Sequence, residues 1–112
     1  MMVKTWTVVV AIVVFVGLAM TAQAEDSVTV NITLMGDRFQ PAEPHATAGK
    51  AITIVVKNLN PGPAEFESNM LRVEKVVTSG GTITMKIRPL APGRYRFFND
   101  FHPDTVGYLV VQ

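Results

Sequence analysis

The sequence predicts an all-β domain, a Greek-key β-sandwich of two antiparallel sheets. Apolar and polar residues alternate through most of residues 25–112, which is the pattern of strands with one buried face. Clusters rich in Gly, Pro, Asn and Asp separate these runs at short intervals, and no stretch keeps a helical period. Several short strands in a segment of this length are typical of two packed sheets.

Three runs alternate most clearly, at residues 28–34, 52–56 and 83–87. The residues expected to face the core in them are Val28, Val30, Ile32, Leu34, Ile52, Ile54, Val56, Ile83, Met85 and Ile87. Residues 69–77 are ambiguous, because they could form a short helical turn before a strand. Tyr95 follows a Pro-Gly turn and enters a late strand, which resembles the tyrosine corner of β-sandwiches.

The first 24 residues have the pattern of a secretory signal peptide. Lys4 precedes an apolar run from Trp6 to Met20, and Ala22 and Ala24 form a small-x-small cleavage pattern. The run is shorter than the roughly 20 residues of a membrane-spanning helix, and no second apolar segment follows. We therefore expect a signal peptide at residues 1–24 and one domain at residues 25–112, in the periplasm and without a stable membrane anchor.

Charge and cysteine content exclude several classes of function. Once Lys4 is removed, nine Lys or Arg residues balance nine Asp or Glu residues, which argues against nucleic-acid binding. The chain has no cysteine, so thiol redox chemistry, thiolate nucleophiles and thiolate metal ligands are excluded. No catalytic triad pattern and no glycine-rich phosphate loop is present.

Several motifs resemble the cupredoxin fold, and within it the cysteine-less cupredoxin domains of bacterial iron-uptake systems. They are Phe39 with Pro41, Gly49, Asn58, the segment PAEFES at residues 63–68, and residues 95–107. In blue-copper cupredoxins the ligands are two histidines, a cysteine and usually a methionine. The resemblance places the first histidine at Ala64, the cysteine at Asn99, the second histidine at His102 and the methionine near Thr105 or Val106. Losing three of the four ligands argues against a blue-copper electron carrier.

Other ligand types stand near the vacated positions. Glu65 and Glu67 flank the lost histidine, and Asp100 and His102 occupy the last loop. Residues two apart on an extended chain point the same way, so we expect Glu65 to pair with Glu67 and Asp100 with His102. The resemblance places all four at one end of the sandwich. A mixed oxygen and nitrogen site of this kind suits iron, copper(II), manganese or zinc.

Each candidate ligand also has a plain structural interpretation. The two glutamates could be a solvated strand face, and His102 could be a capped loop residue. Asn99 is expected to orient the loop by hydrogen bonds. Asp104 is most simply a turn residue, and Met35 and Met70 are alternative soft ligands in loops or at strand ends.

The resemblance implies a periplasmic metal protein that works with an iron permease and a periplasmic iron-binding protein, and that oxidises or hands over iron. Bound iron would be held by hard anionic oxygens, which favour the ferric ion and make a ferroxidase chemically reasonable. Two alternatives remain open. One is a docking module without metal, and the other is a copper carrier.

Overall fold

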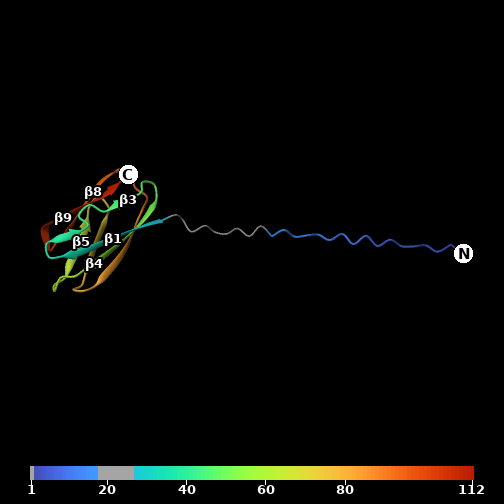
Figure 1. Ribbon diagram of the computed structural model, residues 1–112, viewed down its shortest axis with the longest axis horizontal. Coiled ribbons are helices and arrows are strands. Elements are labelled where there is room, and N and C mark those ends of the chain that lie inside the picture. The colour runs from blue at the N-terminus through green and yellow to red at the C-terminus, as the bar shows by residue number, and fades with distance from the viewer. Residues whose placement is uncertain (1, 18–26) are drawn as a thin grey trace.

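The computed structural model describes residues 2–17 and 27–112. Within these residues there are nine strands and no helix (Figure 1). The strands are β1 (Ser27–Met35), β2 (Arg38–Gln40), β3 (His45–Ala46), β4 (Ala51–Asn58), β5 (Ala64–Ser68), β6 (Val73–Val77), β7 (Thr82–Ile87), β8 (Gly93–Asn99) and β9 (His102–Val111).

Residues 2–17 are exposed and contain no regular secondary structure. No helix with the length and apolar character of a membrane span occurs in the described residues. The expected cleavage site at Ala22 to Ala24 lies outside them, so the signal peptide stays a prediction.

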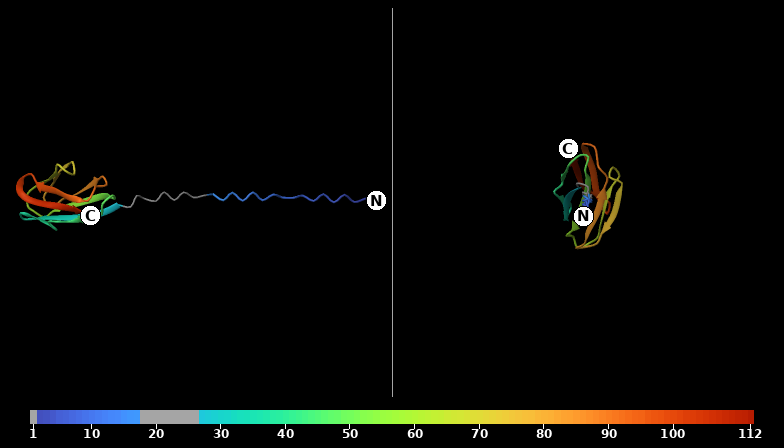
Figure 2. Two further views of the ribbon diagram at one scale, coloured as in Figure 1. Left: turned by 90° about the horizontal axis from the view of Figure 1, so that it is seen from above. Right: turned by 90° about the vertical axis from the view of Figure 1, so that its right-hand side faces the viewer.

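The strands form two sheets that face each other as the layers of a sandwich (Figure 2). One sheet has the order β2-β1-β4-β7 and the other β3-β9-β8-β5-β6. The predicted sandwich is confirmed, but the sheets are mixed rather than wholly antiparallel. β1 pairs with β4, and β3 with β9, in parallel. Residues 36–50, with β2 and β3, carry the chain back before β4 begins, so β4 runs in the same direction as β1. Alternation in the sequence indicates which face of a strand is buried, and it does not indicate which strands are neighbours.

The core lies between the sheets and confirms nearly all of the positions expected from alternation. Val28 alone of that set is only partly buried, at the margin of the core. Three buried rings form its centre: Phe66 stacks on Phe97 with centroids 5.0 Å apart, and Phe39 meets both edge-on. Aromatic pairs in these arrangements add to the free energy gained by burial alone.

The turns confirm one further expectation and settle the ambiguity at residues 69–77. The Tyr95 hydroxyl donates to the Ala91 carbonyl oxygen at 2.8 Å, as in a tyrosine corner. The ambiguous residues 69–77 form a turn followed by β6, with no helix. β5 and β6 are therefore a hairpin, and β5 also pairs with β8 on its other side.

Candidate metal centre

β5 directs Glu65 and Glu67 to the outer face of the five-stranded sheet. The other residues of the strand are buried, and the two glutamates between them are half-buried. Phe66 fixes this orientation because its ring is held between the sheets against Phe97. Successive side chains of a strand point to opposite faces, so burying Phe66 turns both of its neighbours outward.

Asp100 reaches the glutamates from the turn between β8 and β9. Its backbone N–H donates to the Glu65 carbonyl oxygen at 2.9 Å, which ties the turn to β5. One carboxylate oxygen each from Glu65, Glu67 and Asp100 lie within 4.8 Å of one another. Because metal–oxygen distances are about 2.0–2.6 Å, one cation can contact all three with small adjustments. We call these three residues the carboxylate cluster.

The Asn99 side chain links β5 to the turn that carries Asp100, and so anchors the carboxylate cluster. Its side-chain oxygen accepts hydrogen bonds from the backbone N–H groups of Glu65, at 3.0 Å, and Phe101, at 3.2 Å. The residue is only 2% exposed and lies at a register shift between β8 and β9. This confirms the expectation that Asn99 orients the loop by hydrogen bonds.

Glu74 is a fourth carboxylate beside the cluster, and sequence reasoning missed it. It lies directly opposite Glu67 in the β5–β6 hairpin and forms a side-chain hydrogen bond with Glu65. Placing the turn at residues 69–72 would have revealed this register. That placement was not available while residues 69–77 could still be helical.

The cluster is electrostatically unfavourable in the absence of a cation. Burial raises the pKa of Glu65, and the hydrogen bond and negative charge of Glu74 raise it further, with smaller contributions from Asp100 and Glu67. Burial also raises the pKa of Glu67, followed by repulsion from Asp100 and Glu74. Every influence on these two carboxyl groups disfavours their charged forms, and this is an arrangement that a bound cation relieves.

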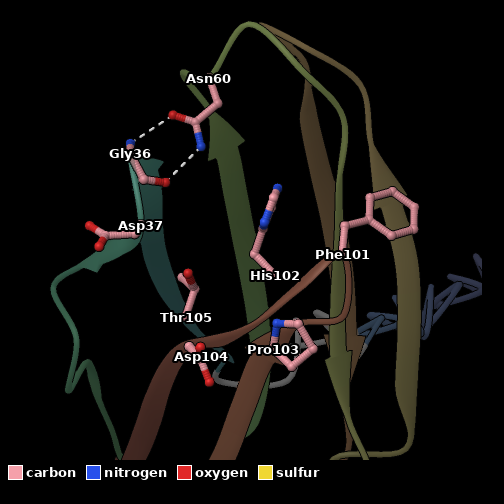
Figure 3. Close-up of a pocket in the computed structure, with 8 residues that line it drawn as sticks. All are labelled: Gly36, Asp37, Asn60, Phe101, His102, Pro103, Asp104 and Thr105. Atoms are coloured by element: carbon pink, nitrogen blue, oxygen red, sulfur yellow. Dashed lines mark hydrogen bonds between the residues drawn. The ribbon is translucent and has the colours of Figure 1, made fainter.

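His102 is not part of the carboxylate cluster. It begins β9 and lines a separate pocket at the end of the sandwich, with Asp37, Asn60 and Asp104 among the other lining residues (Figure 3). The structure thus does not group His102 with Glu65, Glu67 and Asp100, and metal ligation by His102 stays a prediction. Asp100 and Phe101 form a tight turn rather than extended chain, so the two-residue rule of strands does not apply.

The remaining candidates keep ordinary positions. Asp104 lines the same pocket as His102. Met35 ends β1 and Met70 lies in the β5–β6 turn, and each is half exposed. Ligation of a metal by any of these residues stays a prediction.

Comparison with known proteins identifies the family. The model of the cupredoxin-like domain matches residues 8–111. The chain belongs to the cupredoxin-like domain family. An uncharacterised protein of Rickettsia prowazekii (strain Madrid E) is 35% identical over 83 residues, which are 73% of this chain and 66% of that protein. The match thus spans slightly less than two thirds of its relative.

Two solved structures similar to this cupredoxin-like domain are copper proteins. The metal-binding domain of the Cu(I)-exporting P-type ATPase CopA of Streptococcus pneumoniae D39, solved with Cu(I), has a TM-score of 0.66 and 14% identity over 80% of this chain and 98% of that one. Auracyanin A, a "blue" copper protein of Chloroflexus aurantiacus, has a TM-score of 0.65 and 17% identity over 78% of this chain and 100% of that one. At these identities the likeness shows the fold.

The residues of this cupredoxin-like domain do not fit a thiolate copper site. The chain has no cysteine. At the positions where the resemblance places the first histidine and the cysteine, Ala64 has no donor atom and Asn99 offers only an amide. The Asn99 oxygen is already occupied by two backbone N–H groups. Blue-copper geometry depends on the thiolate that is missing here. The carboxylate cluster, which offers hard oxygen donors, fits iron or another hard cation instead.

Proposed function

We propose that this cupredoxin-like domain is exported to the periplasm of a bacterium and binds iron, or copper(II), as cargo during iron uptake. The observation that carries the proposal is the carboxylate cluster, in which three oxygens lie within 4.8 Å of one another. Glu65, Glu67 and Asp100 supply the oxygens. His102 follows Asp100 by two residues and is the imidazole that a movement of the turn could add.

The donor chemistry supports iron over copper(I). Anionic oxygens are hard ligands, which hold ferric iron more tightly than ferrous iron, so bound iron becomes easier to oxidise. One electron then leaves each ferrous ion and passes to dioxygen or to a partner protein. The domain thus serves either as a ferroxidase or as a carrier that hands iron to a permease.

The proposed partners are a high-affinity iron permease and a periplasmic iron-binding protein. This assignment is supported by the resemblance of residues 63–68 and 95–107 to the cysteine-less domains of iron-uptake systems. Export is supported by the apolar N-terminal run and the Ala-x-Ala pattern. Mass spectrometry of the exported protein should find Glu25 at its N-terminus. An exported protein that still carries residues 1–24 would contradict cleavage of a signal peptide.

Competitive metal loading tests the function. Metal-free protein is offered iron, copper, zinc and manganese together, and the retained ions are measured by elemental analysis. We expect one iron or copper ion per chain, lost in Glu67→Gln and in Asp100→Asn. The matched control is Glu43→Gln. Glu43 is an acidic residue outside the carboxylate cluster, and its side chain pairs with Arg94.

Two outcomes would redirect the proposal. Absence of any stoichiometric ion would leave a docking module without metal, and retention of copper alone would favour a copper carrier. With ferrous iron supplied, oxygen consumption that depends on Glu67 separates a ferroxidase from a passive iron carrier.

A further inference from the structure

The outer face of the five-stranded sheet carries aromatic and apolar side chains that no other strand of residues 27–112 covers (Figure 2). On β8 and β9 the outward side chains alternate with buried ones, and they are Arg94, Arg96, Phe98, Val106, Tyr108 and Val110. The two rings and the two valines are only half-buried. Apolar side chains that share an uncovered sheet face are typical of a protein contact surface.

One end of this face is basic. Arg94 lies over the Tyr108 ring and Arg96 over the Phe98 ring, each with its guanidinium carbon 4.7 Å from the ring centroid. Arg94 also pairs with Glu43, whereas Arg96 makes no ion pair with any residue that the structure describes. Stacking holds a guanidinium in place and leaves its N–H groups free to donate to a carboxylate of another molecule.

The other end of the same face is acidic. Glu65 and Glu67 on β5 lie there with Glu74 on β6, and Glu67 is directly opposite Phe98 in the pairing of β5 with β8. The charged groups that shift the pKa of Glu65 and Glu67 are all carboxylates, and neither glutamate has an ion pair within residues 27–112. Arg96 at one end and the glutamates at the other are therefore each left without an opposite charge.

We propose that two copies of this chain associate face to face through this surface, in a two-fold symmetric dimer. In a two-fold interface, a residue that contacts a second residue of the partner is matched by the reverse contact. Arg96 therefore meets the partner's Glu67, and Glu67 meets the partner's Arg96. Phe98 lies between these two positions on the sheet, so it sits beside the symmetry axis and packs against the partner's Phe98.

The same axis matches the rest of the face. Residues two apart on a strand are separated by about 6.6 Å, and neighbouring strands by about 4.8 Å. With these spacings and the observed register, the axis brings Arg94 to the partner's Glu74. It also brings Val110 to the partner's Val76, which is one of the markedly exposed large apolar side chains of residues 27–112, at 48%. Both charge and apolar surface are thus complementary between the two copies.

The size of the face predicts a weak and reversible dimer. Its four strands β9, β8, β5 and β6 span about 20 Å in each direction, so two copies bury on the order of 1,000 Å² in total. That area is at the lower limit for specific interfaces. We therefore expect a dissociation constant of about 10–100 μM.

Sedimentation velocity of the metal-free exported protein tests the dimer. A chelator is present, because a cation at Glu67 would compete with the partner's Arg96, and a failure here leaves the proposed metal binding untouched. Association should depend on protein concentration and be several-fold weaker in about 0.5 M than in about 0.05 M salt. Arg96→Glu and Glu67→Arg should each abolish it. Lys86→Glu, a charge reversal on β7 of the other sheet, is the matched control and should leave it unchanged.

Mixing the two charge-reversed proteins makes the test specific. In the mixed dimer, Arg96→Glu of one copy meets Glu67→Arg of the other, and the unchanged Arg96 meets the unchanged Glu67. Both contacts again join opposite charges, so the mixture should regain the association of the original protein, which a misfolded variant cannot do. The proposal is overturned if the original protein stays monomeric at about 1 mM, if the dimer survives Arg96→Glu, or if the mixture stays monomeric.

Discussion

At the scale of single residues, Asn99 decides how the carboxylate cluster is built. Its oxygen caps two N–H groups, one on β5 and one in the turn that carries Asp100. Its burial makes the loss of this acceptor costly, because both donors would remain without a partner.

Asn99→Ala should therefore destabilise the protein by about 1–3 kcal/mol, the cost of leaving buried donors unpaired. Chemical denaturation measures the change, and metal affinity should fall with it because Glu65 and Asp100 lose their common anchor. Asn31→Ala, on the exposed face of β1, is the matched control and should stay within about 0.5 kcal/mol. A stability loss no greater than that of the control would contradict this role.

Substituting Glu67 should change the stability of the protein in the opposite direction, by raising it. Its pKa is raised in the folded protein, so the folded state favours its neutral form and the charged form is a cost. This cost is absent well below pH 4.5 and is fully present once pH has risen through the folded-state pKa. Glu67→Gln should raise the melting temperature of the metal-free protein at pH 7, with the gain vanishing toward pH 3. A lower melting temperature at pH 7 would mean that the charge is stabilising.

The sequence predicts that Glu65 and Glu67 face outward, but it does not predict which other side chains lie beside them. Alternation along residues 64–68 fixes which side chains face out, and this is a local property. The placement of His102 depends on a tight turn at Asp100 and Phe101, which no periodicity predicts. Glu74 depends on the hairpin register, which is set by the turn at residues 69–72.

At the scale of elements, the close contact between β8 and β9 supports β5. Gly107 lies opposite Phe97, and a Cβ added at Gly107 would meet the Phe97 ring at 2.4 Å and the Ala42 carbonyl oxygen at 2.8 Å. Phe97 in turn stacks on Phe66, which lies beneath the glutamates. A substitution that disturbs the packing of β9 should therefore displace the Phe97 and Phe66 rings and, with them, the glutamates of the carboxylate cluster.

Gly107→Ala should cost about 1–3 kcal/mol of stability, because the added methyl group has no room. Gly93→Ala is a good control, since it is another strand glycine, on β8, and its added Cβ would meet only ordinary contacts at 3.5 Å or more. Comparing the two variants by urea denaturation checks the prediction. Equal effects would show that the Phe97 contact is easily relieved.

Strand positions were predictable because burial of one face repeats every second residue. The partners of the strands were not. The parallel pairing of β1 with β4 follows from the path of residues 36–50 around the sandwich, which is a matter of tertiary packing. The sequence therefore predicted the faces of the sheets better than their order.

At the scale of the whole molecule, the balance of charge conceals an uneven distribution. The strands of the four-stranded sheet carry only basic charges, at Arg38, Lys57 and Lys86. The carboxylate cluster and Glu74 lie on the other sheet, and binding a cation there must displace any protons that they hold. Metal binding and acidity are thus linked.

Metal affinity should fall as the pH is lowered. The raised pKa values of Glu65 and Glu67 mean that protons begin to compete at a higher pH than for ordinary glutamates. Calorimetric titrations with Mn²⁺ at pH 7 and pH 5 should show at least several-fold weaker binding at pH 5, together with proton release. Identical affinities at the two pH values would place the ion elsewhere.

Paramagnetic line broadening by Mn²⁺ tests the central claim most directly, since Mn²⁺ prefers carboxylate oxygens and broadens NMR signals near its binding site. At a fraction of one equivalent, we expect the amide signals of residues 65–67, 74 and 99–101 to broaden first, and this effect to disappear in Glu67→Gln. Broadening centred on another part of the domain, or spread evenly over its acidic residues, would contradict a metal centre at the carboxylate cluster.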